Sequence, residues 1–263
     1  MRRIMFWSML VLGFVSCSKE EPLKFEDYTA LRAHLRAHFE VFALSEVLTK
    51  YVDYNEDTSN FKNIEGGLID TLKHTGDLVY NDSRQRNGDI IATYDLLLSN
   101  PANTFNFTFN YYRDSLHITG NLQMIEQFVL NKKPKKAITG VIQISTLDGT
   151  VSQHTVDMVQ TPLNLGNSND FQYTGSIRTK LNNGDTAYSY TIVPIENTFW
   201  DGTSNLSFIR PWFGESTLFT SKQHSKGRMI WGYKRDYQFR DDFLYIGFPE
   251  QNDLQLNMRM QLY

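Results

Sequence analysis

The chain is short of several features that define large protein classes. It has one cysteine, Cys17, among 263 residues, and a single thiol forms no disulfide within a chain. Its N-terminal apolar run, Ile4 to Val15, is twelve residues long. Twelve helical residues cover about 18 Å, which is too short for a hydrocarbon core about 30 Å thick. Basic residues are not in excess, because the formal net charge is −3. Nucleic-acid binding calls for a basic face, so we expect no nucleic-acid partner.

Motifs for common catalytic chemistry are also missing. The sequence has no Gly-x-Ser-x-Gly elbow, no phosphate-binding loop and no dinucleotide fingerprint. We therefore expect no cofactor and favour a non-enzymatic binding or structural role. The alternative is a glycan-active hydrolase, because two catalytic carboxylates that are dispersed along a chain leave no motif.

The first 17 residues have the pattern of an export signal. Arg2 and Arg3 precede the apolar run, and Ser16 precedes Cys17. A cysteine at the cleavage position resembles a bacterial lipoprotein signal, although Phe14 stands where that pattern prefers leucine. The resemblance implies that residues 1–16 are removed and that Cys17 is acylated, with palmitate among its chains, which anchors the protein in the membrane. Acylation would also exclude thiolate zinc sites and cysteine catalysis.

A short charged segment follows the cysteine. Ser18, Lys19, Glu20 and Glu21 resemble the Lys-acidic-acidic tag of surface-exposed lipoproteins in Bacteroidota. The alternative is a solvated spacer over residues 17–24. We therefore predict an outer-membrane protein at the cell surface, with a periplasm-facing position as second choice. A glycan or an envelope protein is the expected partner.

The folded part is predicted to be a single mainly-β domain over residues 25–263. A helix is predicted from about Glu26 to Val52, with Arg32, Arg36 and Glu40 opposite its apolar face. The strands are predicted to pair antiparallel, because apolar and polar residues alternate in TFNFTFNY and in LQLNMRMQL. Turns are predicted at Asn87-Gly88, Asp148-Gly149, Asn183-Gly184 and Asp201-Gly202. We expect a sandwich or a curved meander with the helix packed on the sheet.

Two blocks of the sequence carry a further resemblance. They are SRQRNGDIIATYDLLLSNPANTFNFTFNYYRDSLHITGNLQM (Ser83 to Met124) and YTGSIRTKLNNGDTAYSYTIVPI (Tyr173 to Ile195). Both are similar to blocks of uncharacterised β-rich cell-envelope lipoproteins of Bacteroidota. That family has no assigned activity, so the resemblance implies the fold and the location alone.

Two groups of residues have spacings that can suit a metal. His34 and His38 are one helical turn apart, but Leu35 stands where a zinc protease has its catalytic Glu. We interpret them as partly buried histidines with hydrogen-bond partners. A calcium-type loop is the second candidate, although it lacks the usual Gly and the bidentate Glu. Its ligands would be Asp53, Asn55, Asp57 and Ser59.

One stretch, TFWDGTSNLSFIRPWFGEST, combines large aromatic residues with turn residues. Aromatic faces beside polar groups suit sugar rings, and Trp and Arg are frequent interface residues. The competing interpretation is a set of aromatics that close one end of a β core. The predicted ligand surface consists of Trp200, Arg210, Trp212 and Phe213.

Overall fold

The computed structural model describes residues 29–54, 61–63, 69–79, 85–95, 104–127, 134–163, 171–199, 209–232, 234–235, 238–239, 243–249 and 254–257. These residues form one helix, α1 (Thr29–Tyr54), and fifteen strands. The strands are β1 (Phe61–Asn63), β2 (Ile69–Val79), β3 (Gln85–Asp95), β4 (Thr104–Arg113), β5 (Leu116–Gln127), β6 (Lys135–Thr146), β7 (Val151–Pro162), β8 (Phe171–Leu181), β9 (Thr186–Phe199), β10 (Ile209–Thr220), β11 (Gln223–Trp231), β12 (Lys234–Arg235), β13 (Gln238–Phe239), β14 (Phe243–Gly247) and β15 (Leu254–Asn257).

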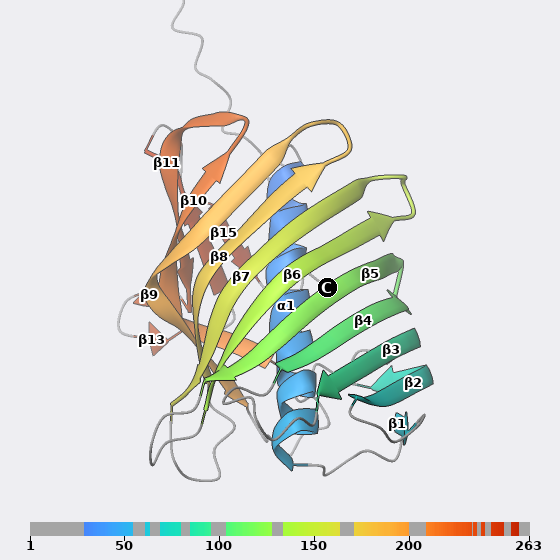
Figure 1. Ribbon diagram of the computed structural model, residues 1–263. Helices are drawn as coiled ribbons and strands as arrows, with labels where there is room; N and C mark the ends of the chain where they lie inside the picture. Colours follow the sequence, from blue (N-terminus) through green and yellow to red (C-terminus); the bar gives the residue numbers. More distant parts are fainter. Residues whose placement is uncertain are drawn as a thin grey trace, which may run out of the picture.

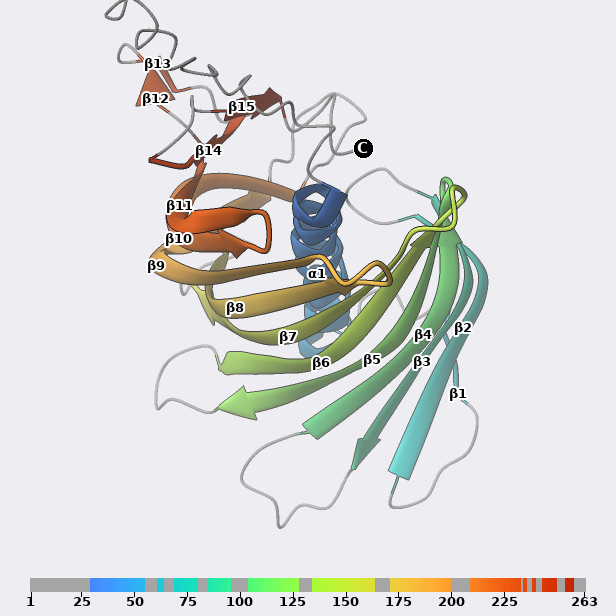
Figure 2. The ribbon, with the colours of Figure 1, turned by 90° about the horizontal axis from the view of Figure 1, so that it is seen from above.

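Thirteen of these strands make one antiparallel sheet in chain order, and β12 and β13 pair separately. The mainly-β prediction is therefore confirmed, and of the two predicted architectures the curved meander is the one found. The sheet curls so strongly that it forms a trough, with α1 lying along the concave side (Figures 1 and 2).

Alternation along the strands builds the concave face. In β4, Phe105, Phe107, Phe109 and Tyr111 are buried while the residues between them are exposed. This is the alternation that the sequence shows from Thr104, because successive side chains of a strand point to opposite faces. The apolar set therefore faces α1 and the polar set faces solvent.

Glycines inside the strands create the curvature. Gly120 of β5 and Gly140 of β6 have φ of +148° and +150°. A Cβ at Gly140 would lie 2.2 Å from the carbonyl oxygen of Asn121, so no other residue fits there. The Asn87-Gly88 turn prediction is wrong, because Gly88 lies within β3, where it pairs with Gly76 of β2 and Tyr111 of β4. The Asp148-Gly149 and Asn183-Gly184 turns are confirmed, between β6 and β7 and between β8 and β9.

Helix α1 begins three residues after the predicted start and ends two residues after the predicted end. From Ala30 to Ser45 every side chain is buried except those of Arg32 and Arg36. Glu40, expected on the polar side with the two arginines, is 1% exposed. The reason is the curvature of the sheet, which surrounds the helix on several sides instead of covering one face. None of the described helical residues forms a stretch that is both long and apolar enough to span a membrane.

An aromatic group fills the centre of the trough. The ring of Phe42 lies 4.7 Å from that of Tyr173 and 5.9 Å from that of Trp231. All three side chains are at most 1% exposed. Burial of one such side chain contributes about 1.5–3 kcal/mol, so these contacts hold α1 firmly against β8 and β11.

Candidate functional site

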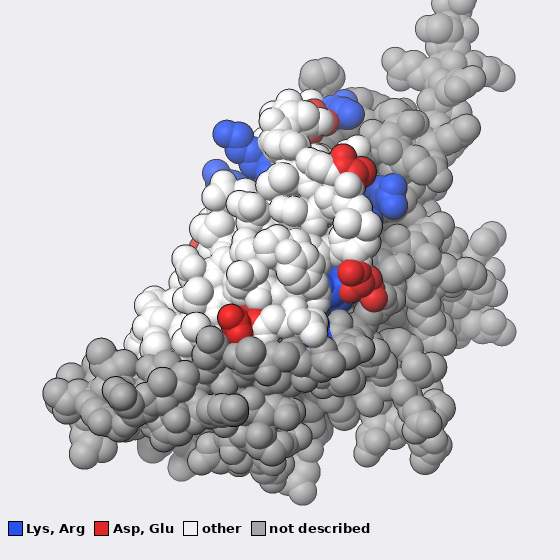
Figure 3. All heavy atoms as spheres, turned by 90° about the vertical axis from the view of Figure 1, so that its right-hand side faces the viewer, with Lys and Arg blue, Asp and Glu red and all other residues white. Residues whose placement is uncertain are grey.

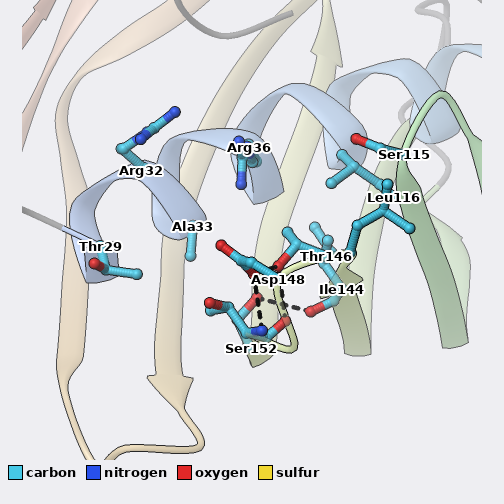
Figure 4. Close-up of a pocket in the computed structure, with 12 residues that line it drawn as sticks. Thr29, Arg32, Ala33, Arg36, Ser115, Leu116, Ile144, Thr146, Asp148 and Ser152 are labelled. Atoms are coloured by element: carbon cyan, nitrogen blue, oxygen red, sulfur yellow. Dashed lines mark hydrogen bonds between the residues drawn. The ribbon is translucent and has the colours of Figure 1, made fainter. Parts of the chain in front are cut away.

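A pocket opens at one rim of the trough, beside the first turns of α1. Its volume is about 470 Å³, and it lies between the helix and the turns that follow β4 and β6 (Figure 4). Apolar side chains contribute to its wall, among them Leu116 and Ile144. Five hydroxyl groups line it as well, those of Thr29, Ser115, Thr146, Thr150 and Ser152.

Three charged side chains line the same pocket. Arg32 and Arg36 come from successive turns of α1, and Asp148 comes from the β6–β7 turn (Figure 4). The described lining therefore carries two positive charges and one negative charge, a net charge of +1. Burial lowers the pKa of Arg36, and the charges of Arg32 and Arg113 lower it further. The negative charge of Asp148 raises it.

Asp148 is held as a carboxylate by its own turn. It accepts hydrogen bonds from the Thr146 hydroxyl and, at 3.0 Å, from the backbone N–H of Thr150. These hydrogen bonds lower the pKa of Asp148 to about 2. The charge of Arg36 lowers this pKa further, so the carboxylate of Asp148 interacts both with its own turn and with Arg36.

A chain of hydrogen bonds runs from the floor of this pocket into the core. It alternates hydroxyl groups with imidazole rings and joins β7, β8 and β9 to α1. In order from the pocket, the members of this histidine chain are Ser152, His154, Thr179, His34, Ser189 and His38.

At the pocket end, the direction of the hydrogen bonds follows from Ser152. One direction makes both contacts of Ser152 hydrogen bonds: its hydroxyl donates to the carbonyl oxygen of Ile144 at 3.2 Å, and its oxygen accepts Nε2–H of His154 at 2.9 Å. A neutral imidazole carries one proton, and the Nδ1 of His154 is therefore an acceptor. Nδ1 accepts the hydroxyl proton of Thr179 at 2.8 Å.

The same logic continues into the helix. The oxygen of Thr179 accepts Nδ1–H of His34 at 2.7 Å, and the Nε2 of His34 accepts the hydroxyl of Ser189 at 2.8 Å. The oxygen of Ser189 then accepts Nε2–H of His38 at 2.9 Å. The remaining ring nitrogen, Nδ1 of His38, is buried without a hydrogen-bond partner. With this assignment, every hydroxyl and imidazole proton points in one direction, from His38 to the pocket.

Burial keeps the three histidines neutral. Burial lowers the pKa of His38 and of His154 to about 3. The pKa of His34 is held well below its usual value by burial first, then by the other two histidines. The interpretation of His34 and His38 as buried, hydrogen-bonded histidines is confirmed. Among the described side chains, no group of three or more His, Cys, Asp and Glu has the arrangement of a metal site.

A buried ionic cluster lies on the side of α1 opposite His34 and His38, around the carboxylate of Glu40. Glu40 contacts Nε of Arg86 at 3.1 Å and Nε of Arg113 at 2.9 Å, and it accepts the Tyr111 hydroxyl at 2.5 Å. Burial raises the pKa of Glu40, but the two guanidinium groups and the Tyr111 hydrogen bond outweigh it, so the pKa is lowered. The cluster joins α1 to β3 and β4, and each oxygen of its carboxylate contacts one guanidinium group, Oε1 that of Arg86 and Oε2 that of Arg113.

The predicted ligand surface falls partly on described residues. Arg210 and Trp212 lie in β10, and the side chain of Phe213 is 45% exposed on the outer face of that strand. Of the calcium candidates, Asp53 lies in the last turn of α1. The residues outside the described ranges are Cys17, Ser18, Lys19, Glu20, Glu21, Asn55, Asp57, Ser59 and Trp200.

A second aromatic group lies on the outer face of β9 and β10. The rings of Tyr188 and Phe219 are 6.1 Å apart, and those of Tyr190 and Phe219 are 6.3 Å apart. The Arg178 guanidinium lies 4.9 Å from the centre of the Tyr188 ring. Phe219 is 38% exposed, so this outer aromatic group offers ring surface to solvent.

Sequence reasoning missed the histidine chain beyond α1. Ser152 and His154 lie in phase with buried Val156 and Met158 in β7, which is the one signal in the sequence that they face inward. No protein-family model, curated protein or solved structure matches the chain.

Proposed function

We propose that the protein is a lipid-anchored outer-membrane protein, exposed at the cell surface, whose folded part binds a polar, negatively charged ligand. The anchoring and the surface location are supported by the signal before Cys17 and by the segment Ser18 to Glu21. The binding role is carried by the rim pocket, where two guanidinium groups and five hydroxyls line about 470 Å³ of space.

The same pocket favours binding over hydrolysis. A glycosidase needs two carboxyl groups that flank one bond, and the described residues of the pocket wall include a single carboxylate, Asp148. Ser152 Oγ and His154 Nε2 are 2.9 Å apart, and in the direction that also satisfies the contact of Ser152 with Ile144, His154 donates to Ser152 and does not act as its general base. A serine nucleophile would need the opposite tautomer.

Charges of both signs occur on the described surface. On the face shown in Figure 3, several of the described basic side chains lie beside acidic ones. On β10 and β11, Nε of Arg228 lies 2.8 Å from the carboxylate of Glu215.

A thermal-shift screen tests the binding role. Purified full-length protein is heated with acidic sugars, peptidoglycan fragments and phosphate compounds, in parallel with the variant Arg36→Gln. A ligand at 100 times its Kd stabilises by about 2.7 kcal/mol, which raises Tm by about 5–10 °C for a domain of this size. The rise should be lost in Arg36→Gln, and an equal rise in that variant would contradict binding in the pocket.

Anchoring is tested separately. Labelled palmitate should enter the wild-type protein, and Cys17→Ala should abolish both labelling and membrane association. Protease added to intact cells should cleave the native protein but not a version with alanines at Lys19, Glu20 and Glu21. Cleavage of neither, with cleavage in lysed cells, would place the protein on the periplasmic side.

The outer aromatic group supports a second binding candidate, a glycan or an envelope protein. Exposed aromatic rings with a guanidinium beside them suit a sugar ring or an interface. Substitution of both Tyr188 and Phe219 by Ala should then reduce retention on immobilised envelope glycans. Unchanged retention, with an unchanged Tm, would rule out this face as the glycan site.

A further inference from the structure

We propose that the rim pocket selects an oxyanion, a carboxylate or phosphate group, that accepts the Ser152 hydroxyl proton beside the Arg36 guanidinium. This inference rests on the proposed binding function and names the chemistry of its ligand. It follows from the direction of the histidine chain, which determines what Ser152 offers to the pocket.

In this direction of the histidine chain, the hydroxyl of Ser152 donates its proton away from the chain. Its oxygen already accepts Nε2–H of His154, so its single proton points away from the chain. That proton is now directed to the Ile144 carbonyl at 3.2 Å, a distance at the long end for a hydroxyl donor. An anionic oxygen in the pocket would be a stronger acceptor, because charge-assisted hydrogen bonds are shorter and stronger than neutral ones.

The opposite direction of the chain is less favourable. It would place a proton on Nδ1 of His38, which is buried without a hydrogen-bond partner in a ring whose centre lies 5.8 Å from that of Phe42 and 5.6 Å from that of Trp231. A buried N–H without an acceptor is rarer in proteins than a bare acceptor. Reversal would also turn the Ser152 proton towards His154, and the bond to Ile144 would be lost.

The charged residues of the pocket also favour an anionic ligand. Arg36 supplies positive charge to the lining, and Asp148, which interacts with it, is also held by hydrogen bonds within its own turn. Because burial disfavours the charged form of Arg36, an oxyanion beside it would relieve that penalty. Guanidinium groups match carboxylate and phosphate geometry better than any other side chain. A ligand that is cationic or only a hydrogen-bond donor meets neither requirement.

Two sources of such a group are within reach. Thr29 at the pocket follows Cys17 by 29 − 17 = 12 residues. Twelve residues span at most about 40 Å, so an anchor at Cys17 would keep the pocket near the lipid surface. The oxyanion can belong to a soluble molecule or to a lipid headgroup, and the experiment distinguishes them.

The first measurement is made on the wild-type protein. Full-length protein labelled with ¹⁵N-histidine is observed at pH 7, where the ring-nitrogen shifts report which nitrogen is protonated. We expect Nε2–H for His38 and His154 and Nδ1–H for His34, unchanged by inorganic phosphate. A proton on Nδ1 of His154 would overturn the proposal without any variant, because Ser152 would then donate into the chain.

The second measurement is binding of inorganic phosphate and of acetate at constant ionic strength. We expect Ser152→Ala to weaken binding by about tenfold or more, the usual effect of a lost hydrogen bond to a charged group. The control Ser145→Ala removes a hydroxyl from the outer face of β6, next to Ile144, and should leave affinity unchanged. Phosphatidylglycerol vesicles that displace phosphate identify a lipid source, and vesicles that do not displace it identify a soluble one.

Failure of the proposed binding function can be distinguished from failure of the role given to Ser152. If neither anion binds the wild-type protein, the anionic-ligand function fails together with this inference. If both bind, and Arg36→Gln abolishes binding while Ser152→Ala has the wild-type affinity, the pocket function stands and the role of Ser152 is overturned.

Discussion

Acid should destabilise this protein over the pH range in which an ordinary histidine becomes charged. His34, His38 and His154 are buried and neutral in the folded state: burial lowers the pKa of His38 and His154 to about 3 and holds the pKa of His34 well below its usual value. In the unfolded chain the same groups titrate near pH 6.5. Because the folded pKa is lowered, their stabilising contribution is fully present above about pH 6.5 and is lost as the pH falls from there towards 3.

The magnitude follows from proton linkage. Between pH 7 and pH 5, each histidine that protonates only on unfolding reduces the free energy of unfolding by about 2 kcal/mol. Three such groups give about 6 kcal/mol, which is comparable with the whole stability of many domains, about 5–15 kcal/mol. The lowered pKa of Glu40 matters only below about pH 4.5, outside this window.

Urea unfolding at pH 7.0, 6.0 and 5.0, followed by tryptophan fluorescence, measures this dependence. The matched variant is His38→Gln, whose amide can keep the hydrogen bond to Ser189 without a titrating group. Its loss of stability over the same range should fall from about 6 to about 4 kcal/mol. A wild-type loss below about 2 kcal/mol, or an identical loss in the variant, would refute the neutral histidine chain.

Three substitutions, with Gly149→Ala as a control, test the packing that holds the site in place. Gly140→Ala should lower the free energy of unfolding by more than about 2 kcal/mol, since its Cβ would meet a backbone oxygen at 2.2 Å. At Gly149 a Cβ would meet nothing within 4 Å, so Gly149→Ala should lose only the φ strain of about 1 kcal/mol. Glu40→Gln should lose about 3–5 kcal/mol because Arg86 and Arg113 would stay buried without a carboxylate, and a loss under about 1 kcal/mol in urea unfolding would contradict this. Phe42→Ala should lose about 3–5 kcal/mol by opening a cavity beside α1, and an unchanged Tm would argue against that contact.

The elements of this fold were predictable because their signals are local. The helix and the strand that begins at Thr104 follow from periodicities that can be seen within ten to twenty residues. The error at Asn87-Gly88 shows the limit of such signals. The same dipeptide suits a hairpin turn and a bend inside a strand, and the close approach of Tyr111, 23 residues further on, decides between them.

By itself, the sequence determined the helix, the alternation of the strands and the export pattern that ends at Cys17, whereas the choice of a chain-order meander over a sandwich came from the tertiary structure. Only the tertiary structure decided that Glu40 is buried and that His34 meets Thr179 and Ser189, which lie 145 and 155 residues away. The physical reason is that an inward-facing Ser, Thr or His breaks no local pattern. Its partners depend on the register and curvature of the whole sheet, and those set both the histidine chain and the pocket at its end.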